Sequence, residues 1–570
     1  MILSLSLLSV LLWASGGVQT PLDREWIRDG SFESAGHHRR EDASLHRGWP
    51  VDLSSPGAGF PYTPLLYDVN GDGACEIFLT GGETFGLSGD GSFLPGWPVQ
   101  EMTYMGYAST GQLPGPSAGD MNGDGVAEIM WSTRDWYAGS SYLWSFNGRA
   151  PDGSDLAGYP QNAPDQSSNA LASPFVLGDG DGDGQMEAVT AHTLGNTGDY
   201  YRISCLNYTG EILYTTDLNG SEDILGIYFG DADGDGGEEF FAVTMFSGDF
   251  RLHLLDSDGN HQPGYPVSIY TPSGGNLMFG PPIPADLDGE GDLEIMLGYY
   301  VSSTAYAVAV HHDGTVMEGF PVAVATGSQL FYLGMGDITG DGYPELLAVD
   351  NELTADYRIW AIDMETGIPL PGWPVYLSHW PKGFPVVADL DGDGTQDISF
   401  TTDGGNVHAL ASDGSELTGF PKTMVSASTS GTAAGDIDGD GFYELVAATW
   451  DGWVYAWDTD GQVSENNRDW PMRGVDPRNT GVYGGSVQSG VGEQGPEVGF
   501  TVSRNPVTGT AVFRVTGTTA QPRIEIFDVT GRKRATVTSS WTPSADCGSG
   551  VYFARLAGME AETVKFLLVR

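Results

Sequence analysis

The strongest constraint on the fold is a repeat of about fifty residues that runs along most of the chain. A Gly–aromatic–Pro tripeptide occurs at residues 48–50, 96–98, 158–160, 264–266, 319–321, 372–374 and 419–421, and Asp469-Trp470-Pro471 ends the series. The step from Tyr159 to Tyr265 is about double the others, so one unit near Leu213 lacks its tripeptide. The pattern predicts eight units.

Each unit contains the signals of short strands. Apolar runs such as 77–79 and 445–448 alternate with Asp-Gly turns such as 258–259 and 460–461, and this order is typical of hairpins. A single small antiparallel sheet cannot bury both faces. We therefore predict an all-β fold, a β-propeller of eight (alternatively seven) four-stranded blades. An open solenoid is the less favoured arrangement, and the aromatic-Pro residues are expected to pack between blades.

An acidic loop lies in every unit. With the loop residues numbered from the first Asp, position 1 is Asp in all eight copies, Gly follows position 5, and position 9 is Glu or Asp. Calcium prefers six to eight oxygen ligands, and alternating positions of a tight loop direct their oxygens inward. The candidate metal ligands are Asp68, Asn70, Asp72, Glu76, Asp120, Asn122, Asp124, Glu128, Asp179, Asp181, Asp183, Glu187, Asp231, Asp233, Asp235, Glu239, Asp286, Asp288, Glu290, Glu294, Asp337, Thr339, Asp341, Glu345, Asp389, Asp391, Asp393, Asp397, Asp436, Asp438, Asp440 and Glu444.

Other metal sites fit these loops less well. An EF-hand needs Glu at position 12 and flanking helices, whereas position 12 of the first loop is Leu79 in an apolar run. No Cys/His spacing fits zinc. Asp, Asn and Gly also form ordinary turns, but the regular repetition favours up to eight Ca²⁺ ions. The fifth loop, with Glu290, and the sixth, with Thr339, are expected to bind most weakly.

Charge and composition limit the partners. The 24 Lys+Arg face 76 Asp+Glu, a formal net charge of −52. This excludes nucleic acid as the main partner and disfavours an anionic membrane surface. Hydrophobic residues make up 40% of the chain, enough for folded cores. The three cysteines allow at most one disulfide.

The ends of the chain differ from its middle. Residues 1–20 resemble a secretory signal peptide, because a short apolar run precedes small residues; a buried N-terminal strand is the alternative. No later segment is apolar enough to cross a membrane. We divide the rest into an N-terminal extension (21–47), the propeller (48–482), a Gly/Ser-rich linker (483–498) and a C-terminal domain (499–570), whose alternating strands predict a small Ig-like β-sandwich.

Two resemblances follow from these motifs. The pattern D-x-[DN]-G-D-G-x-x-E-[IL] closely resembles the FG-GAP/VCBS repeat of integrin α-subunit propellers and many bacterial surface proteins. It covers about residues 48–482, is supported by the ending 470–483, and implies calcium at the loop positions named above. The C-terminal domain resembles the sorting domain of type IX secretion cargo at residues 505–506, 524–532, 550–556 and 563–570. That resemblance implies type IX secretion machinery as a partner and surface attachment; a plain Ig-like domain is the alternative.

Catalytic motifs are hard to find. The ten histidines are scattered, His311-His312 before an Asp-Gly turn is predicted to lie on the surface, and no Gly-x-Ser-x-Gly elbow occurs. A calcium-bearing propeller could be a polysaccharide lyase, but a polyuronate groove would favour more basic residues than this chain offers. We therefore expect a secreted or bacterial outer-surface adhesion module with an extracellular protein or glycan ligand, not an enzyme. A structural surface-layer protein is the third hypothesis.

Overall fold

The computed structural model describes residues 44–54, 63–99, 115–162, 173–218, 222–272, 281–351, 357–464 and 471–483, with internal gaps at 82, 138–140, 195–199, 236, 289–290, 303, 327–328, 342, 365, 429 and 473–474. In the C-terminal domain it describes 500–502, 510–515, 523–528, 532–538, 540–544, 547–556 and 563–568. The predicted signal peptide and linker residues 484–498 lie outside these ranges. Every regular element of the described residues is a strand. Within these residues no helix is long and apolar enough to cross a membrane.

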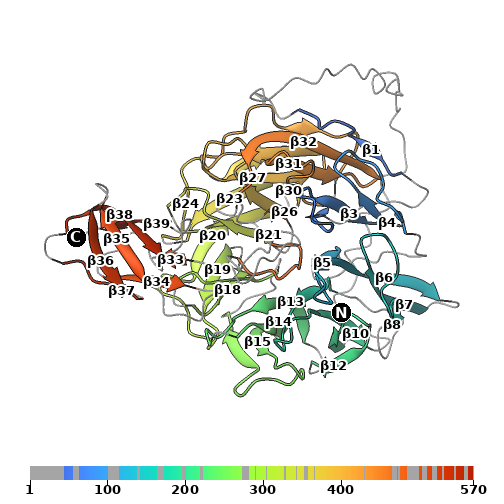
Figure 1. Ribbon diagram of the computed structural model, residues 1–570, viewed down its shortest axis with the longest axis horizontal. Coiled ribbons are helices and arrows are strands. Elements are labelled where there is room, and N and C mark those ends of the chain that lie inside the picture. The colour runs from blue at the N-terminus through green and yellow to red at the C-terminus, as the bar shows by residue number, and fades with distance from the viewer. Residues whose placement is uncertain are drawn as a thin grey trace. The chain divides into compact units, whose positions relative to one another are not determined.

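The first half of the repeat region forms four sheets (Figure 1). Blade 1 contains β2 (Leu65–Tyr67), β3 (Glu76–Thr80) and β4 (Thr84–Leu87); blade 2 contains β5 (Ser117–Gly119), β6 (Glu128–Tyr137), β7 (Ser141–Arg149) and β8 (Gln161–Asn162); blade 3 contains β9 (Val176–Gly178), β10 (Glu187–Leu194), β11 (Tyr200–Leu206) and β12 (Ile212–Asp217); blade 4 contains β13 (Asp223–Gly230), β14 (Glu239–Phe246), β15 (Asp249–Leu254) and β16 (Val267–Tyr270).

The second half of the repeat region forms four more sheets. Blade 5 contains β17 (Ile283–Ala285), β18 (Glu294–Val301), β19 (Thr304–Val310) and β20 (Val322–Thr326); blade 6 contains β21 (Gln329–Gly336), β22 (Glu345–Asn351), β23 (Tyr357–Asp363), β24 (Ile368–Pro369) and β25 (Val375–Leu377); blade 7 contains β26 (Pro381–Ala388), β27 (Asp397–Thr402), β28 (Asn406–Leu410) and β29 (Lys422–Thr423); blade 8 contains β30 (Ala433–Gly435), β31 (Phe442–Ala448), β32 (Trp453–Gln462) and β1 (Val51–Asp52).

The eight sheets confirm the eight-bladed propeller and rule out the seven-bladed alternative. All pairings within the blades are antiparallel, and the apolar faces of neighbouring blades share continuous cores that run from each blade to the next and from blade 8 to blade 1. The strand count varies more than predicted. Blade 1 has three strands, extended by a bridge between Thr84 and Val99, and β24 and β25 of blade 6 both pair with β23.

The N-terminal strand closes the ring. Strand β1 pairs with β32, so the earliest described strand completes the last blade, with Val51 opposite Val454. The Leu53 N–H donates to the Gly452 carbonyl over 2.9 Å, and the Leu53 side chain is buried. This pairing covers the outer edge of β32 with a strand of only two residues, which leaves little unpaired edge for association with another chain.

The Gly–aromatic–Pro tripeptides join neighbouring blades, as predicted. In four of the tripeptides the aromatic side chain donates a hydrogen bond to a turn of the next blade. Trp49, Trp97 and Trp373 donate their indole N–H groups to the carbonyls of Gly89, Pro151 and Ser412 over 2.7–2.8 Å. The Tyr159 hydroxyl donates to the Asn207 carbonyl in the same way. The aromatic repeat is therefore the packing element between blades.

The unit without a tripeptide uses a different aromatic residue. In blade 3 the expected position is taken by β12, where Tyr214 packs on Gly259 in a turn of blade 4; a Cβ on Gly259 would lie 2.1 Å from the tyrosine ring. The Thr216 hydroxyl also donates to the Gly259 carbonyl. Tyr214, a residue of β12, therefore makes the contact with the next blade that the aromatic residue of a tripeptide makes in other units.

The glycine of the tripeptide gives a testable contrast. Gly96 (φ 83°) and Gly264 (φ 105°) both have left-handed backbones. A Cβ on Gly96 would meet the Asp152 carbonyl oxygen at 1.9 Å, whereas a Cβ on Gly264 would meet nothing within 4 Å. Gly264→Ala should cost about 1 kcal/mol of backbone strain, and Gly96→Ala should cost at least ~2 kcal/mol more because two blades must separate. Chemical unfolding of both variants checks this; equal losses would show that the blade contact is unimportant.

Residues 471–483, the axial segment, lie at the centre of the ring (Figure 1). The first strands of neighbouring blades contact one another, and the axial segment bonds to those strands or their adjoining residues. Its backbone carbonyls at Pro471, Pro477, Arg478 and Thr480 accept the N–H groups of Ala434, Ala118, Leu177 and Phe229, and the Tyr483 N–H donates to the Pro284 carbonyl. The segment therefore connects five blades and fills the region around the axis.

The C-terminal domain has the predicted two-sheet architecture. One sheet contains β33 (Phe500–Val502), β34 (Ala511–Val515) and β37 (Ser540–Trp541); the other contains β36 (Lys533–Val537), β35 (Ile524–Asp528), β38 (Gly550–Leu556) and β39 (Thr563–Leu568). Ala511 and Trp541 of the first sheet share a core with Ile524, Tyr552 and Leu568 of the second. All three cysteines of the chain are free, so no disulfide supports either domain.

Candidate metal centres

The acidic loops occupy one defined place in every blade, between its first and second strands. Position 1 directly follows the first strand, as Asp68 follows β2 and Asp389 follows β26. Position 9 opens the second strand in blades 1–7 and lies within it in blade 8. The buried Leu79, at position 12, belongs to β3, which confirms a strand–loop–strand motif in place of an EF-hand.

Hydrogen bonds to the carboxylates hold the loop closed. In the first loop, Asp68 Oδ1 accepts the N–H groups of Gly71 and Asp72, and its Oδ2 accepts the Gly73 N–H over 2.8 Å. Glu76 Oε2 accepts the Val69 N–H over 3.0 Å. Positions 1 and 9 thus fix the backbone of the loop from both ends.

The same arrangement recurs along the chain, with differences in the loops that depart from the motif. Loops 2, 3, 7 and 8 repeat the bonds from position 1, and the position-9 carboxylate accepts the position-2 N–H in all of loops 1–3 and 5–8. In loop 6 the Thr339 hydroxyl donates to Glu345 over 3.4 Å. Glu290 of loop 5 lies outside the described residues, so its predicted role stays a prediction.

The structure brings predicted ligands together as groups. Single ligand atoms of Asp179, Asp181 and Glu187 lie within 4.8 Å of one another, as do those of Asp231, Asp233 and Glu239 and those of Asp389, Asp391 and Asp397. These are positions 1, 3 and 9 of loops 3, 4 and 7. The spacing is that expected of oxygens around a single cation.

Burial makes the position-9 carboxylates hard to ionise without a cation. Burial, together with the charges of the neighbouring loop aspartates, raises the pKa of Glu76, Glu128, Glu187 and Glu294 to about 7. It raises the pKa of Glu239, Glu345 and Asp397 to about 8 and that of Glu444 to about 9. A divalent cation would supply the opposite charge that these buried groups lack.

A buried oxygen of the fourth loop supports a metal ion there. Glu239 Oε2 is buried and accepts no hydrogen bond from the described residues. A buried carboxylate oxygen without a partner is costly, and calcium binds this type of hard oxygen. The position-9 side chains together with positions 1, 3 and 5 would hold the ion, and the ion would cross-link the two strands that each loop joins.

The pKa shifts predict an unusual pH dependence for the calcium-free protein. Because folding raises these pKa values above their ordinary 4.5 for Glu, the stabilisation is present below about pH 4.5 and is lost as the pH rises through 7 to 9. We therefore expect the chain in EDTA to melt at a higher temperature at pH 5 than at pH 8. Saturating calcium should remove or reverse this difference, and a melting temperature in EDTA that rises from pH 5 to pH 8 would contradict the assignment.

Histidines beside two loops were not anticipated from the sequence. His311, predicted to lie on the surface, is partly buried with Nδ1 2.8 Å from Glu294 Oε1, and His312 Nδ1 lies 3.0 Å from Asp292. In blade 8, His46 from the N-terminal extension lies beside Glu444. His311 directly follows β19, whose last residue Val310 pairs with Ile295 beside Glu294, so its place depends on the strand register. His46 precedes β1, and no pattern within a repeat unit marks it.

The fold and the repeated loops define a class: the chain is a β-propeller protein whose blades carry acidic loops. A family model described as an FG-GAP-like repeat matches residues 389–447, which span the seventh and eighth loops. This part of the chain therefore resembles an FG-GAP-like repeat. No curated protein matches the sequence significantly.

Several solved structures are similar to this chain at low sequence identity. BamB from Moraxella catarrhalis shares 14% identity, with a TM-score of 0.38, covering 72% of this chain and 100% of BamB. The Dos1 propeller shares 12% identity, with a TM-score of 0.39 and coverage of 73% and 96%. The biofilm matrix protein Bap1 from V. cholerae shares 14% identity, with a TM-score of 0.29 and coverage of 76% and 94%.

Proposed function

We propose that the protein is a secreted or cell-surface binding module whose propeller is stabilised by calcium. The observation that carries the proposal is the placement of eight acidic loops between the first two strands of all eight blades. Extracellular modules commonly use calcium sites with dissociation constants of about 10⁻⁴–10⁻³ M. A propeller held together in this way, without a disulfide among its described cysteines, is suited to an environment rich in calcium.

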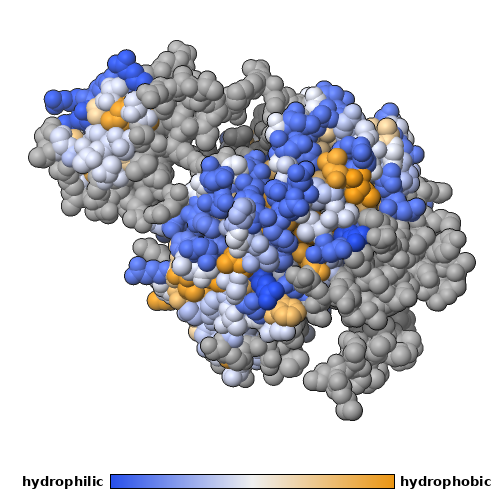
Figure 2. Space-filling view, turned by 90° about the horizontal axis from the view of Figure 1, so that it is seen from below, coloured by the Kyte–Doolittle hydropathy of each residue, from blue (hydrophilic) through white to orange (hydrophobic). Residues whose placement is uncertain are grey.

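The rest of the propeller supports binding more than catalysis. The axial segment fills the region around the ring axis with buried side chains such as Val475 and Val482, so a reaction site would have to lie elsewhere. The view in Figure 2 shows a mainly hydrophilic face with smaller hydrophobic areas. Several large apolar side chains are exposed, among them Tyr376, Val425 and Trp450, and such side chains often contact a ligand.

Export is the second half of the proposal. The two-sheet C-terminal domain and its resemblance to type IX sorting domains support delivery to the cell surface. Expression in a host with this secretion system tests it: deletion of residues 499–570 should retain the propeller inside the cell, whereas the full chain should reach the surface. Equal surface amounts of both forms would reject the sorting role and leave an accessory Ig-like domain.

The binding role is tested with the full chain on glycan and protein arrays. We expect specific binding in millimolar calcium and its loss in EDTA, because the blades that present the ligand surface need filled loops. Magnesium serves as the control cation. If the protein instead cleaved an acidic polysaccharide and formed unsaturated ends, the binding role would be wrong and the protein would be a lyase. Calcium-dependent growth of particles in light scattering, without any soluble ligand, would instead indicate a surface-layer protein.

A further inference from the structure

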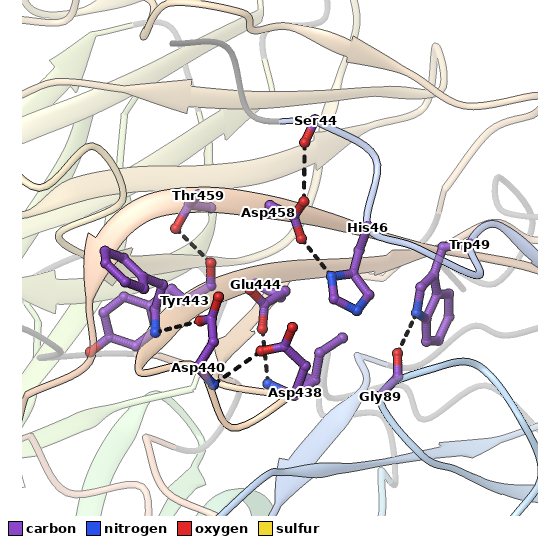
Figure 3. Close-up of polar contacts among 12 residues, drawn as sticks. Ser44, His46, Trp49, Gly89, Asp438, Asp440, Tyr443, Glu444, Asp458 and Thr459 are labelled. Carbon is purple, nitrogen blue, oxygen red and sulfur yellow. Dashed lines mark hydrogen bonds and ion pairs between the residues drawn. The ribbon is translucent and has the colours of Figure 1, made fainter. Parts of the chain in front are cut away.

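A mixed histidine–carboxylate cluster lies where the ring closes (Figure 3). His46, Glu444 and Asp458 each offer one ligand atom, and these atoms lie within 4.8 Å of one another. The three residues are 8%, 0% and 6% exposed. His46 and Asp458 are not part of any acidic loop, whereas Glu444 is position 9 of the eighth loop, so the cluster adjoins that loop and adds two residues from outside it.

Three different parts of the fold supply the three residues. Glu444 lies on β31, Asp458 lies directly opposite it on β32, and His46 precedes β1. The His46 N–H donates to the Ala456 carbonyl and the Asp458 N–H donates to the Ser44 carbonyl, both over 2.8 Å. The backbone therefore fixes the positions of all three side chains. Among the described strands, β1 alone brings an N-terminal segment to a later blade.

The side chains have the partners expected around a metal ligand set. Asp458 Oδ1 lies 2.5 Å from His46 Nδ1, and Oδ2 accepts the Ser44 hydroxyl over 3.0 Å. Glu444 Oε2 accepts the Ile437 N–H over 3.0 Å, while Oε1 is buried and accepts no hydrogen bond. That oxygen is the second, independent sign of a missing ligand, because a buried carboxylate oxygen is rarely left without a partner.

We propose that His46, Glu444 and Asp458 bind one divalent transition-metal ion of the zinc class, next to the eighth acidic loop. Imidazole nitrogen suits zinc and its neighbours in the first transition row, whereas calcium prefers oxygen throughout. One nitrogen and two carboxylate oxygens form an ordinary zinc ligand set. To bind the ion, the direct contact between His46 Nδ1 and Asp458 Oδ1 would have to open, and Glu444 would contribute Oε1.

The site would connect the two ends of the propeller. His46 and Asp458 are 412 residues apart in sequence, so the ion joins the closing segment to the last blade by side chains as well as by backbone. Because the three ligands meet only in the folded ring, the ion would bind the folded state alone and stabilise it by mass action. The ion is therefore a structural clasp that acts in addition to calcium and does not depend on the binding role proposed above.

The test uses the untagged full chain in saturating calcium, so that the acidic loops hold a hard cation. Co²⁺ serves as the optical probe, and Zn²⁺ is measured by its displacement of Co²⁺. We expect one equivalent of tightly bound Zn²⁺ in the wild type and at least a tenfold weaker affinity in His46→Gln and Asp458→Asn. His311→Gln, which changes the histidine beside the fifth loop, is the matched control and should retain the tight site.

Three results would overturn the proposal: no tight Zn²⁺ in the wild type, equal affinity in wild type and His46→Gln, or loss of the site in His311→Gln alone. If His46→Gln does not fold, X-ray absorption at the zinc edge of the wild type decides. One imidazole nitrogen in a shell otherwise of oxygens supports the site, and a shell of oxygens alone rejects it. A chain that binds zinc in this way but shows no calcium effect on melting would separate this site from the acidic-loop proposal.

Discussion

Calcium added to the metal-free full chain should raise its melting temperature by on the order of 20 °C. A ligand that binds only the folded state contributes RT ln(1+[L]/Kd), about 2.7 kcal/mol per site at a hundredfold excess over Kd. Several filled loops contribute together, and each kilocalorie shifts the melting temperature of a large domain by about 1–3 °C. The buried position-9 carboxylates should make the effect large, because ion binding also satisfies groups such as Glu239 Oε2.

Calorimetry in EDTA and across a calcium titration measures the shift. Two adjacent glutamates in blade 4 supply a matched control for individual sites: Glu239 is position 9 of its loop and clusters with Asp231 and Asp233, whereas Glu238 is exposed. Glu239→Gln should lower the number of bound calcium ions by one, and Glu238→Gln should leave it unchanged. An unchanged melting temperature in calcium would mean that the loops are only turns.

The second large effect concerns ring closure. Removal of residues 1–54 should abolish cooperative unfolding of the propeller or lower its melting temperature by more than about 10 °C, because β32 loses its partner strand and the burial of Trp49 and Leu53 is lost. The hydrogen bond from Trp49 to Gly89, which connects blade 8 to blade 1, disappears as well. The unpaired β32 edge should also promote association.

Removal of residues 1–43 is the control, since it leaves β1 and the preceding His46 in place. This shorter deletion should melt like the full chain and remain monodisperse in size-exclusion chromatography. Similar melting of the two deletions would show that the propeller does not depend on β1 for closure, and it would also weaken the case for a clasp at His46.

Most of the fold could be predicted from patterns within single repeat units of the sequence. The repeat length and the Asp-Gly turns predicted the blades because a blade forms from consecutive strands, and its signals lie within one unit. The loop positions were equally readable, since Asp68 and Glu76 are only eight positions apart yet act on one backbone turn. The interblade role of the aromatic tripeptides followed from their recurrence once in each unit.

The features that the sequence did not reveal are all long-range. Strand β1 completes the last blade because the first and last blades of a closed ring are neighbours. The residues Val51 and Asp52 contain no signal that predicts a partner strand about four hundred residues later. Tyr214 was missed because it packs from the strand where a tripeptide was expected. The histidines at positions 46 and 311 approach acidic loops only through strand register, which no pattern within a single unit specifies.

The axial segment determines how the propeller would respond to mechanical tension. The axial segment is the last part of the propeller before the linker and the C-terminal domain, so a pull from that side reaches Tyr483 and its bond to Pro284 first. The load then passes in turn to the bonds at Phe229, Leu177, Ala118 and Ala434. These bonds would break one after another while the blades stay folded, so a surface-attached molecule would lengthen along its axis before its ring opened.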